Sequence, residues 1–84
     1  MRVGVQFTGT LAANQTKRWF TYNWPQNWHV VWYVVPTSPR PGGPQIEWSV
    51  AVERATATHI TYWVTIKNAT ASPVNIEARY AVLN

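Results

Sequence analysis

Apolar and polar residues alternate with a period of two through six segments of this chain of 84 residues. Side chains on a β-strand point alternately to its two faces, so this pattern is typical of strands that bury one face. No segment shows the 3.6-residue period and the capping residues of a helix. The expected strands are residues 3–11, 16–22, 29–35, 45–54, 59–67 and 74–83.

Turn-forming residues separate these segments. Residues 37–44, TSPRPGGP, hold three prolines and two glycines, and Pro36 ends the strand before them. Residues 68–73, NATASP, form a compact polar turn, which predicts a hairpin between the last two strands. The chain has room for one hydrophobic core. We therefore predict an all-β fold: a single domain over residues 1–84, a small antiparallel β-sandwich of about six strands, immunoglobulin-like or barrel-like, with no substantial helix.

The alternation also assigns residues to faces. Trp48 is in phase with the apolar residues of its segment, which predicts that it belongs to the core. Trp63 shares its face with threonines, His59 and Lys67, so it is expected on a polar surface. The apolar residues predicted to share the buried face of the first segment are Val3, Val5, Phe7 and Leu11.

Composition excludes several classes of protein. Charged residues make up only 12 % of the chain, about half the usual share, and the many β-branched and aromatic residues argue against disorder. The absence of cysteine excludes disulfides and thiol catalysis. No apolar run reaches 18 residues, so no membrane span is expected. The first segment alternates and lacks the apolar run of a signal peptide. The compartment is therefore undecided, although a secreted protein or an extracellular domain is one possibility.

Catalysis is not expected from this set of side chains. Glu47 and Glu53 share a strand face roughly 20 Å apart, whereas the paired carboxylates of glycosidases lie roughly 5 to 9.5 Å apart. Glu77 is the only other acidic side chain. His29 and His59 have no metal-ligand spacing. We therefore predict a protein that is not an enzyme and that needs no metal or cofactor.

Residues 30–35, VVWYVV, are apolar on both faces. Strands buried on both faces read as continuous apolar runs, but each sheet of a small sandwich has only one inner face. The second face is then covered either by a loop such as 37–44 or by another copy of the chain. We expect a homo-oligomer, most simply a symmetric dimer. The predicted interface residues are Val31, Trp32, Tyr33 and Val35.

Residues 22–29, YNWPQNWH, include NWPQNW, which we expect to form a polar loop between two strands. The segment combines two indoles, three amides, a phenol and an imidazole. An indole can pack on the apolar C–H face of a pyranose, while amide side chains bond its hydroxyls as donors and acceptors. The leading prediction is a lectin-like, metal-independent carbohydrate-binding module that is multivalent through self-association, with a glycan as its partner. The predicted ligand-binding residues are Tyr22, Asn23, Trp24, Gln26, Asn27, Trp28, His29 and Trp63.

Two alternatives stay open. Trp24 and Trp28 can instead fold back and close the end of the sandwich, which would suit a structural, oligomerisation or adhesion module without a small ligand. A single-stranded nucleic-acid-binding β-barrel is the second alternative, although the dispersed basic residues make nucleic acid the less favoured partner. Its stacking platform would consist of Lys17, Arg18, Trp19, Trp63 and Lys67.

Overall fold

The computed structural model describes residues 1–84 as six antiparallel strands without a helix, which confirms the all-β prediction. Consequently no helix is present that could cross a membrane. The largest difference from the expected boundaries is in the second strand, which continues three residues further, through Pro25. The strands are β1 (Arg2–Leu11), β2 (Thr16–Pro25), β3 (Val30–Pro36), β4 (Ile46–Glu53), β5 (His59–Asn68) and β6 (Val74–Val82).

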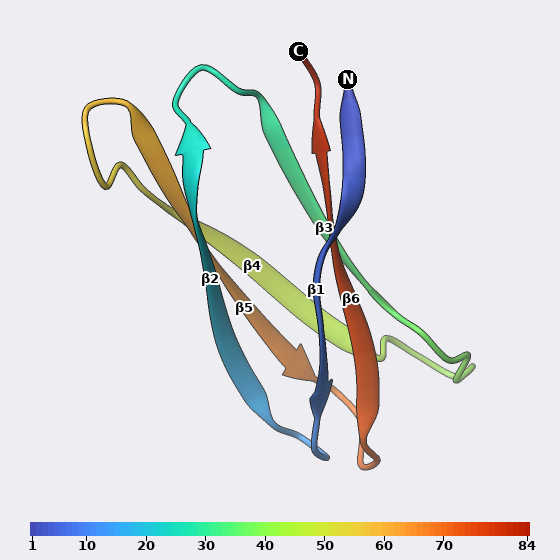
Figure 1. Ribbon diagram of the computed structural model, residues 1–84. Helices are drawn as coiled ribbons and strands as arrows, with labels where there is room; N and C mark the ends of the chain where they lie inside the picture. Colours follow the sequence, from blue (N-terminus) through green and yellow to red (C-terminus); the bar gives the residue numbers. More distant parts are fainter.

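The strands form two three-stranded sheets, with the orders β1-β6-β3 and β2-β5-β4 (Figure 1). Only the β4–β5 connection stays within one sheet, and every other connection carries the chain from one sheet to the other. β5 pairs with β2 and β4, whereas β6 pairs with β1 and β3. The predicted hairpin of β5 and β6 is therefore wrong, because their turn crosses between the layers.

The buried amide of Asn68 holds this crossing turn in place. Asn68 is completely buried, and its Nδ2 donates to the backbone oxygens of Ala12 at 3.0 Å and Ser72 at 2.7 Å. Its Oδ1 accepts from the backbone N and the hydroxyl of Thr70 at 2.9 and 2.8 Å. One side chain thus connects the β1–β2 turn to the β5–β6 turn, and all of its polar atoms are satisfied.

The core between the sheets has an aliphatic end and an aromatic end. Residues such as Leu11, Ile66 and Ile76 fill the end near the β1–β2 and β5–β6 turns. At the opposite end, where the two termini lie (Figure 1), the ring of Trp24 is the centre of an aromatic cluster. Its centroid is 5.2 to 6.2 Å from four other rings, in the edge-to-face arrangement that aromatic pairs favour. These rings belong to Trp28, Trp32, Tyr62 and Tyr80.

A bulge in β1 corrects the face predicted for its first residues. Val5 is paired with Arg79 and Phe7 with Ala78, so Gln6 is an extra residue. An extra residue reverses the alternation of a strand. Val3 and Val5 therefore lie on the outer face, where they are 73 % and 50 % exposed, whereas Phe7 and Leu11 face the core.

Trp48 is also less buried than predicted. It lies on the inward face of β4, but β4 is an edge strand of its sheet. The opposite sheet covers this edge only in part, so Trp48 is 38 % exposed and Val52 is 65 % exposed. The prediction that Trp48 belongs to the core is therefore wrong, because alternation identifies a face but not how completely the other layer covers it.

Candidate functional site

A second bulge, in β2, decides where the tryptophans of the 22–29 segment point. Thr21 is paired with Tyr62 and Trp24 with Ile60, so Tyr22 and Asn23 together oppose Thr61. Asn23 has a φ of 64°, a left-handed conformation that asparagine adopts more readily than most residues. The extra residue turns Trp24 from the outer to the inner face.

The ligand-stacking role predicted for Trp24 is therefore wrong. Trp24 is 8 % exposed, and its Nε1 donates to the hydroxyl oxygen of Thr21 at 2.9 Å. Trp28 is half-buried against Trp24, and the guanidinium of Arg2 lies 4.5 Å from the centroid of its ring. Both indoles close the aromatic end of the sandwich, as the end-plug alternative describes.

The rest of the predicted loop is held by its backbone. The Gln26 backbone N donates to Thr58 O at 2.9 Å, and the Gln26 side chain accepts a hydrogen bond from Arg54. The backbone oxygen of Asn27 and the backbone N of His29 both bond the side chain of Asn84, each at 2.9 Å. The side chains of Asn23, Asn27 and His29 are exposed, but no exposed indole lies among them.

Three aromatic side chains instead meet on the outer face of the β2-β5-β4 sheet, and we call Phe20, Tyr22 and Trp63 the aromatic strip. Phe20 is paired with Trp63 across β2 and β5, and their ring centroids are 5.1 Å apart with a tilt of 34°. Phe20 and Tyr22, two residues apart on β2, have centroids 6.1 Å apart. Phe20 is 56 % exposed and Tyr22 is 65 % exposed, so the strip faces solvent.

Tyr22 and Trp63 were predicted ligand-binding residues, whereas Phe20 was not. The signal for Phe20 was present in the sequence, since strand alternation places it on the same face as Tyr22. What alternation does not show is that β5 is the neighbour of β2, which brings Trp63 beside Phe20.

Polar contacts hold the indole of Trp63 in place. Its Nε1 donates to Oε1 of Glu53 at 2.8 Å. The guanidinium of Arg18 lies 5.1 Å from the centroid of the same ring, within the range of a cation–π interaction. The strip is thus bordered by one acidic and one basic group.

The platform proposed for single-stranded nucleic acid is not assembled as predicted. Trp19 faces inward and stacks on Phe7, with centroids 5.1 Å apart. Lys17 donates from Nζ to the backbone oxygen of Thr10 at 3.0 Å, away from the strip. The registers place two cations and two carboxylates on the face of the strip, so that face carries no net charge. These residues are Arg18, Lys67, Glu47 and Glu53.

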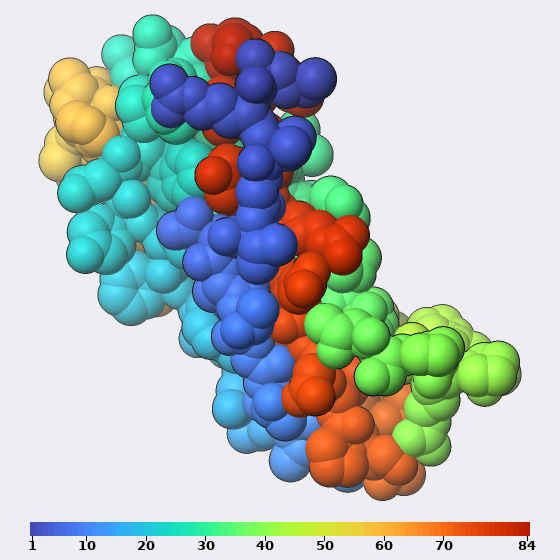
Figure 2. All heavy atoms as spheres, turned by 45° about the vertical axis from the view of Figure 1, so that its right-hand side comes forward, coloured from blue at the N-terminus to red at the C-terminus, as the bar shows by residue number.

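The two faces of β3 differ in burial. Trp32 is 5 % exposed in the core, so it is removed from the predicted oligomer interface. Val31 and Tyr33 are 48 % and 46 % exposed on the opposite face, and Val35 is half-buried there. Figure 2 shows this outer face, with β1, β6 and β3 side by side. The 37–44 loop leaves Val31 and Tyr33 uncovered.

No three His, Asp or Glu side chains lie close enough together to hold a metal ion. His59 bonds through Nδ1 to the hydroxyl of Thr58 at 2.8 Å. Glu77 forms an ion pair of 3.0 Å with Arg79. Partial burial within the aromatic cluster raises the pKa of the Tyr62 phenol.

Comparison of the chain with protein-family models, with curated proteins and with solved structures finds no significant match. The functional inference therefore depends on the geometry described above.

Proposed function

We propose that this protein is a non-catalytic, metal-independent carbohydrate-binding module whose glycan contacts the aromatic strip. The observation that carries the proposal is that Phe20 and Tyr22 are 56 % and 65 % exposed. Their rings contact each other, and the ring of Phe20 also contacts that of Trp63. Leaving large aromatic rings in water gives up the stabilisation that their burial would contribute to folding. Contiguous exposed rings among hydroxyl and charged side chains are typical of a binding surface.

The groups around the strip suit the chemistry of a sugar. The exposed parts of Phe20 and Tyr22 offer apolar surface to the C–H face of a pyranose. The Glu53 carboxylate bonds Trp63 through one oxygen and has further acceptor capacity for sugar hydroxyls. The amide of Asn23, on the bulge next to Tyr22, supplies a donor and an acceptor.

The charge of the surface favours a neutral ligand over a nucleic acid. Single-stranded nucleic acids bind aromatic side chains that lie in a positively charged groove. The charges of the four charged residues on the face of the strip cancel one another, although the whole chain carries a net charge of +4. We therefore expect binding that changes little with added salt, in contrast to the steep salt dependence of phosphate recognition.

A single shallow site of this kind would bind a glycan weakly. Joining several sites in one assembly raises the overall affinity without a new contact. We accordingly propose that the binding form is a homo-oligomer.

A glycan array tests the proposed site. We would compare the parent protein with a Phe20→Ala, Trp63→Ala double variant, and use Trp48→Ala as the matched control. Trp48 is a partly exposed tryptophan outside the strip, so the control removes an indole without altering the proposed site. The proposal predicts binding by the parent and the control that the double variant loses.

Binding that survives in a folded double variant would place the site elsewhere. No binding by the folded parent would favour a structural or adhesion module.

A further inference from the structure

The outer face of the β1-β6-β3 sheet has an apolar half near the termini. The registers define two cross-strand rows on it: Val3, Ala81 and Val31 in one, and Val5, Arg79 and Tyr33 in the next. We call the residues of these rows other than Arg79 the apolar patch. Four of its five members are between 46 % and 73 % exposed. Val3 and Val5 lie on this face only because of the β1 bulge, so residue alternation alone does not reveal the patch.

Four of the five patch residues, all except Val31, line a hollow of about 250 Å³. Gly4, Tyr80 and Arg79 complete its lining, so a charged guanidinium borders the hollow beside the apolar side chains. Because Ala81 is small and lies between two valines, the middle of the first row is lower than its ends. An enclosed cavity of about 150 Å³ takes a benzene molecule, so the hollow has room for an apolar side chain from another surface.

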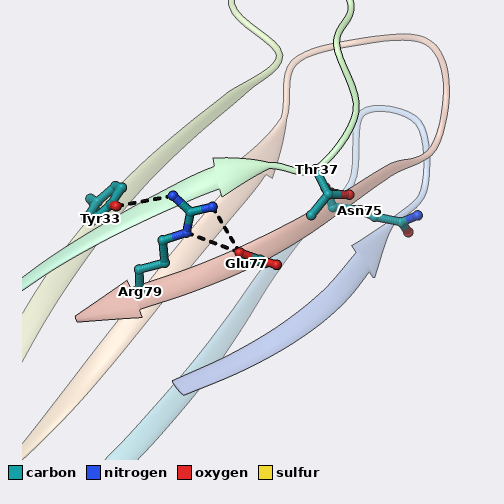
Figure 3. A network of polar contacts seen from close by, with 5 residues as sticks. All are labelled: Tyr33, Thr37, Asn75, Glu77 and Arg79. Carbon is teal, nitrogen blue, oxygen red and sulfur yellow. Dashed lines mark hydrogen bonds and ion pairs between the residues drawn. The ribbon is translucent and has the colours of Figure 1, made fainter. Parts of the chain in front are cut away.

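The charged groups beside the patch neutralise each other. Arg79 donates from Nη1 to the Tyr33 hydroxyl at 3.2 Å, and its Nη2 lies 3.0 Å from Oε2 of Glu77 (Figure 3). The Arg79 guanidinium also lies 5.5 Å from the centroid of the Tyr33 ring. This ion pair therefore adds no net charge to a contact at the patch, which matters because two chains that each carry +4 repel one another.

We propose that the apolar patch packs against the same patch of a second copy of this chain across a two-fold axis. A symmetric interface needs a surface that complements itself. This patch has both the protruding side chains and the hollow that such a contact needs, because exposed valines border a hollow that can receive the valines of the partner. The patch has five residues, whereas a standard interface has roughly 20 to 30 residues on each side, so the dimer is weak and concentration-dependent. The inference gives an interface to the proposed self-association and does not depend on glycan binding.

Sedimentation equilibrium from micromolar to millimolar concentration tests the interface. The variants are Val3→Lys and Val31→Lys, and the matched control is Val52→Lys, a valine of similar exposure on the other sheet. Circular dichroism and thermal melting establish that each variant is folded. All three side chains are exposed in the single chain, so we expect folding to be retained.

We expect a reversible dimer for the parent and for Val52→Lys, and an affinity reduced by more than about tenfold in each patch variant, because a lysine ammonium would be desolvated in the contact. A parent dimer that both folded patch variants retain would overturn this interface while leaving self-association in place. A parent that stays monomeric at millimolar concentration would overturn both.

Discussion

The indole Nε1 of Trp63 donates a hydrogen bond of 2.8 Å to the Glu53 carboxylate across neighbouring strands β5 and β4. This contact fixes the orientation of the half-buried ring of the aromatic strip. It also places a carboxylate beside the rings, where a sugar that contacts them would present its hydroxyls. Orientation and polarity at the proposed site thus depend on the same pair of residues.

The first prediction tests the contribution of the Glu53 side chain to binding. Glu53→Ala removes the acceptor for Trp63 and should weaken glycan affinity roughly fivefold, since a hydrogen bond contributes about 1 kcal/mol. Glu53→Gln keeps an oxygen that can accept from the indole, so its affinity should stay close to that of the parent. Isothermal titration calorimetry measures both. Equal affinity of parent and Glu53→Ala would show that the contact is irrelevant to binding.

The second prediction concerns Trp24, which the β2 bulge turns into the core. Trp24→Ala should lower the free energy of unfolding by about 4 kcal/mol, because it removes the central ring of the aromatic cluster. Phe20→Ala, on the exposed strip, should lower it by less than about 1 kcal/mol. Urea denaturation followed by circular dichroism gives both values. Similar losses for the two variants would contradict the assignment of one ring to the core and the other to the surface.

The third prediction concerns Asn68. Asn68→Asp keeps acceptors for Thr70 but loses the donors that bond the carbonyls of Ala12 and Ser72, so stability should fall by about 3 kcal/mol. The matched control is Asn75→Asp, at an exposed position of β6 where the side-chain oxygen of Asn75 accepts from the Thr10 hydroxyl. A carboxylate can accept that bond equally well, so the control should melt near the parent temperature. A harmless Asn68→Asp substitution would contradict the role given to the buried amide.

The fourth prediction concerns pH. Burial holds the pKa of Tyr62 above its ordinary value in the folded protein. The unfolded chain therefore loses this proton first, and the stability contributed by the neutral phenol is complete below about pH 10 and declines as the pH rises further. Melting temperatures measured across this range should fall less steeply for Tyr62→Phe than for the parent. Parallel curves for the two proteins would remove Tyr62 as a cause of alkaline destabilisation.

Strand number, fold class and most strand faces follow from residue alternation alone. The outward placement of Trp63 is one example, because it depends only on the period of two within β5. Pairing between strands is not encoded in that period. The β5–β6 turn looks like a hairpin turn in sequence, yet it crosses between the two layers, where the buried Asn68 side chain bonds it to the β1–β2 turn.

The candidate site was harder to predict because single extra residues reverse strand faces. The bulge at Tyr22 and Asn23 moves Trp24 into the core, and the bulge at Gln6 moves Val3 to the surface. Asn23 tolerates the left-handed conformation at its bulge, but asparagine is also common in loops, and a loop was the interpretation that the NWPQNW segment favoured. Identifying the strip also required knowing that β2 and β5 are neighbours.

The central claim is that the glycan contacts the aromatic strip and not the tryptophans of the 24–28 segment. A ¹H–¹⁵N NMR titration tests it most directly, because the six tryptophans each give a separate indole N–H signal. We would titrate the parent protein with the glycan selected by the array and assign the indole signals by single substitution. The account predicts that the Trp63 signal shifts while those of Trp24 and Trp28 stay in place. Shifts of Trp28 or Trp24 with an unmoved Trp63 signal would contradict it.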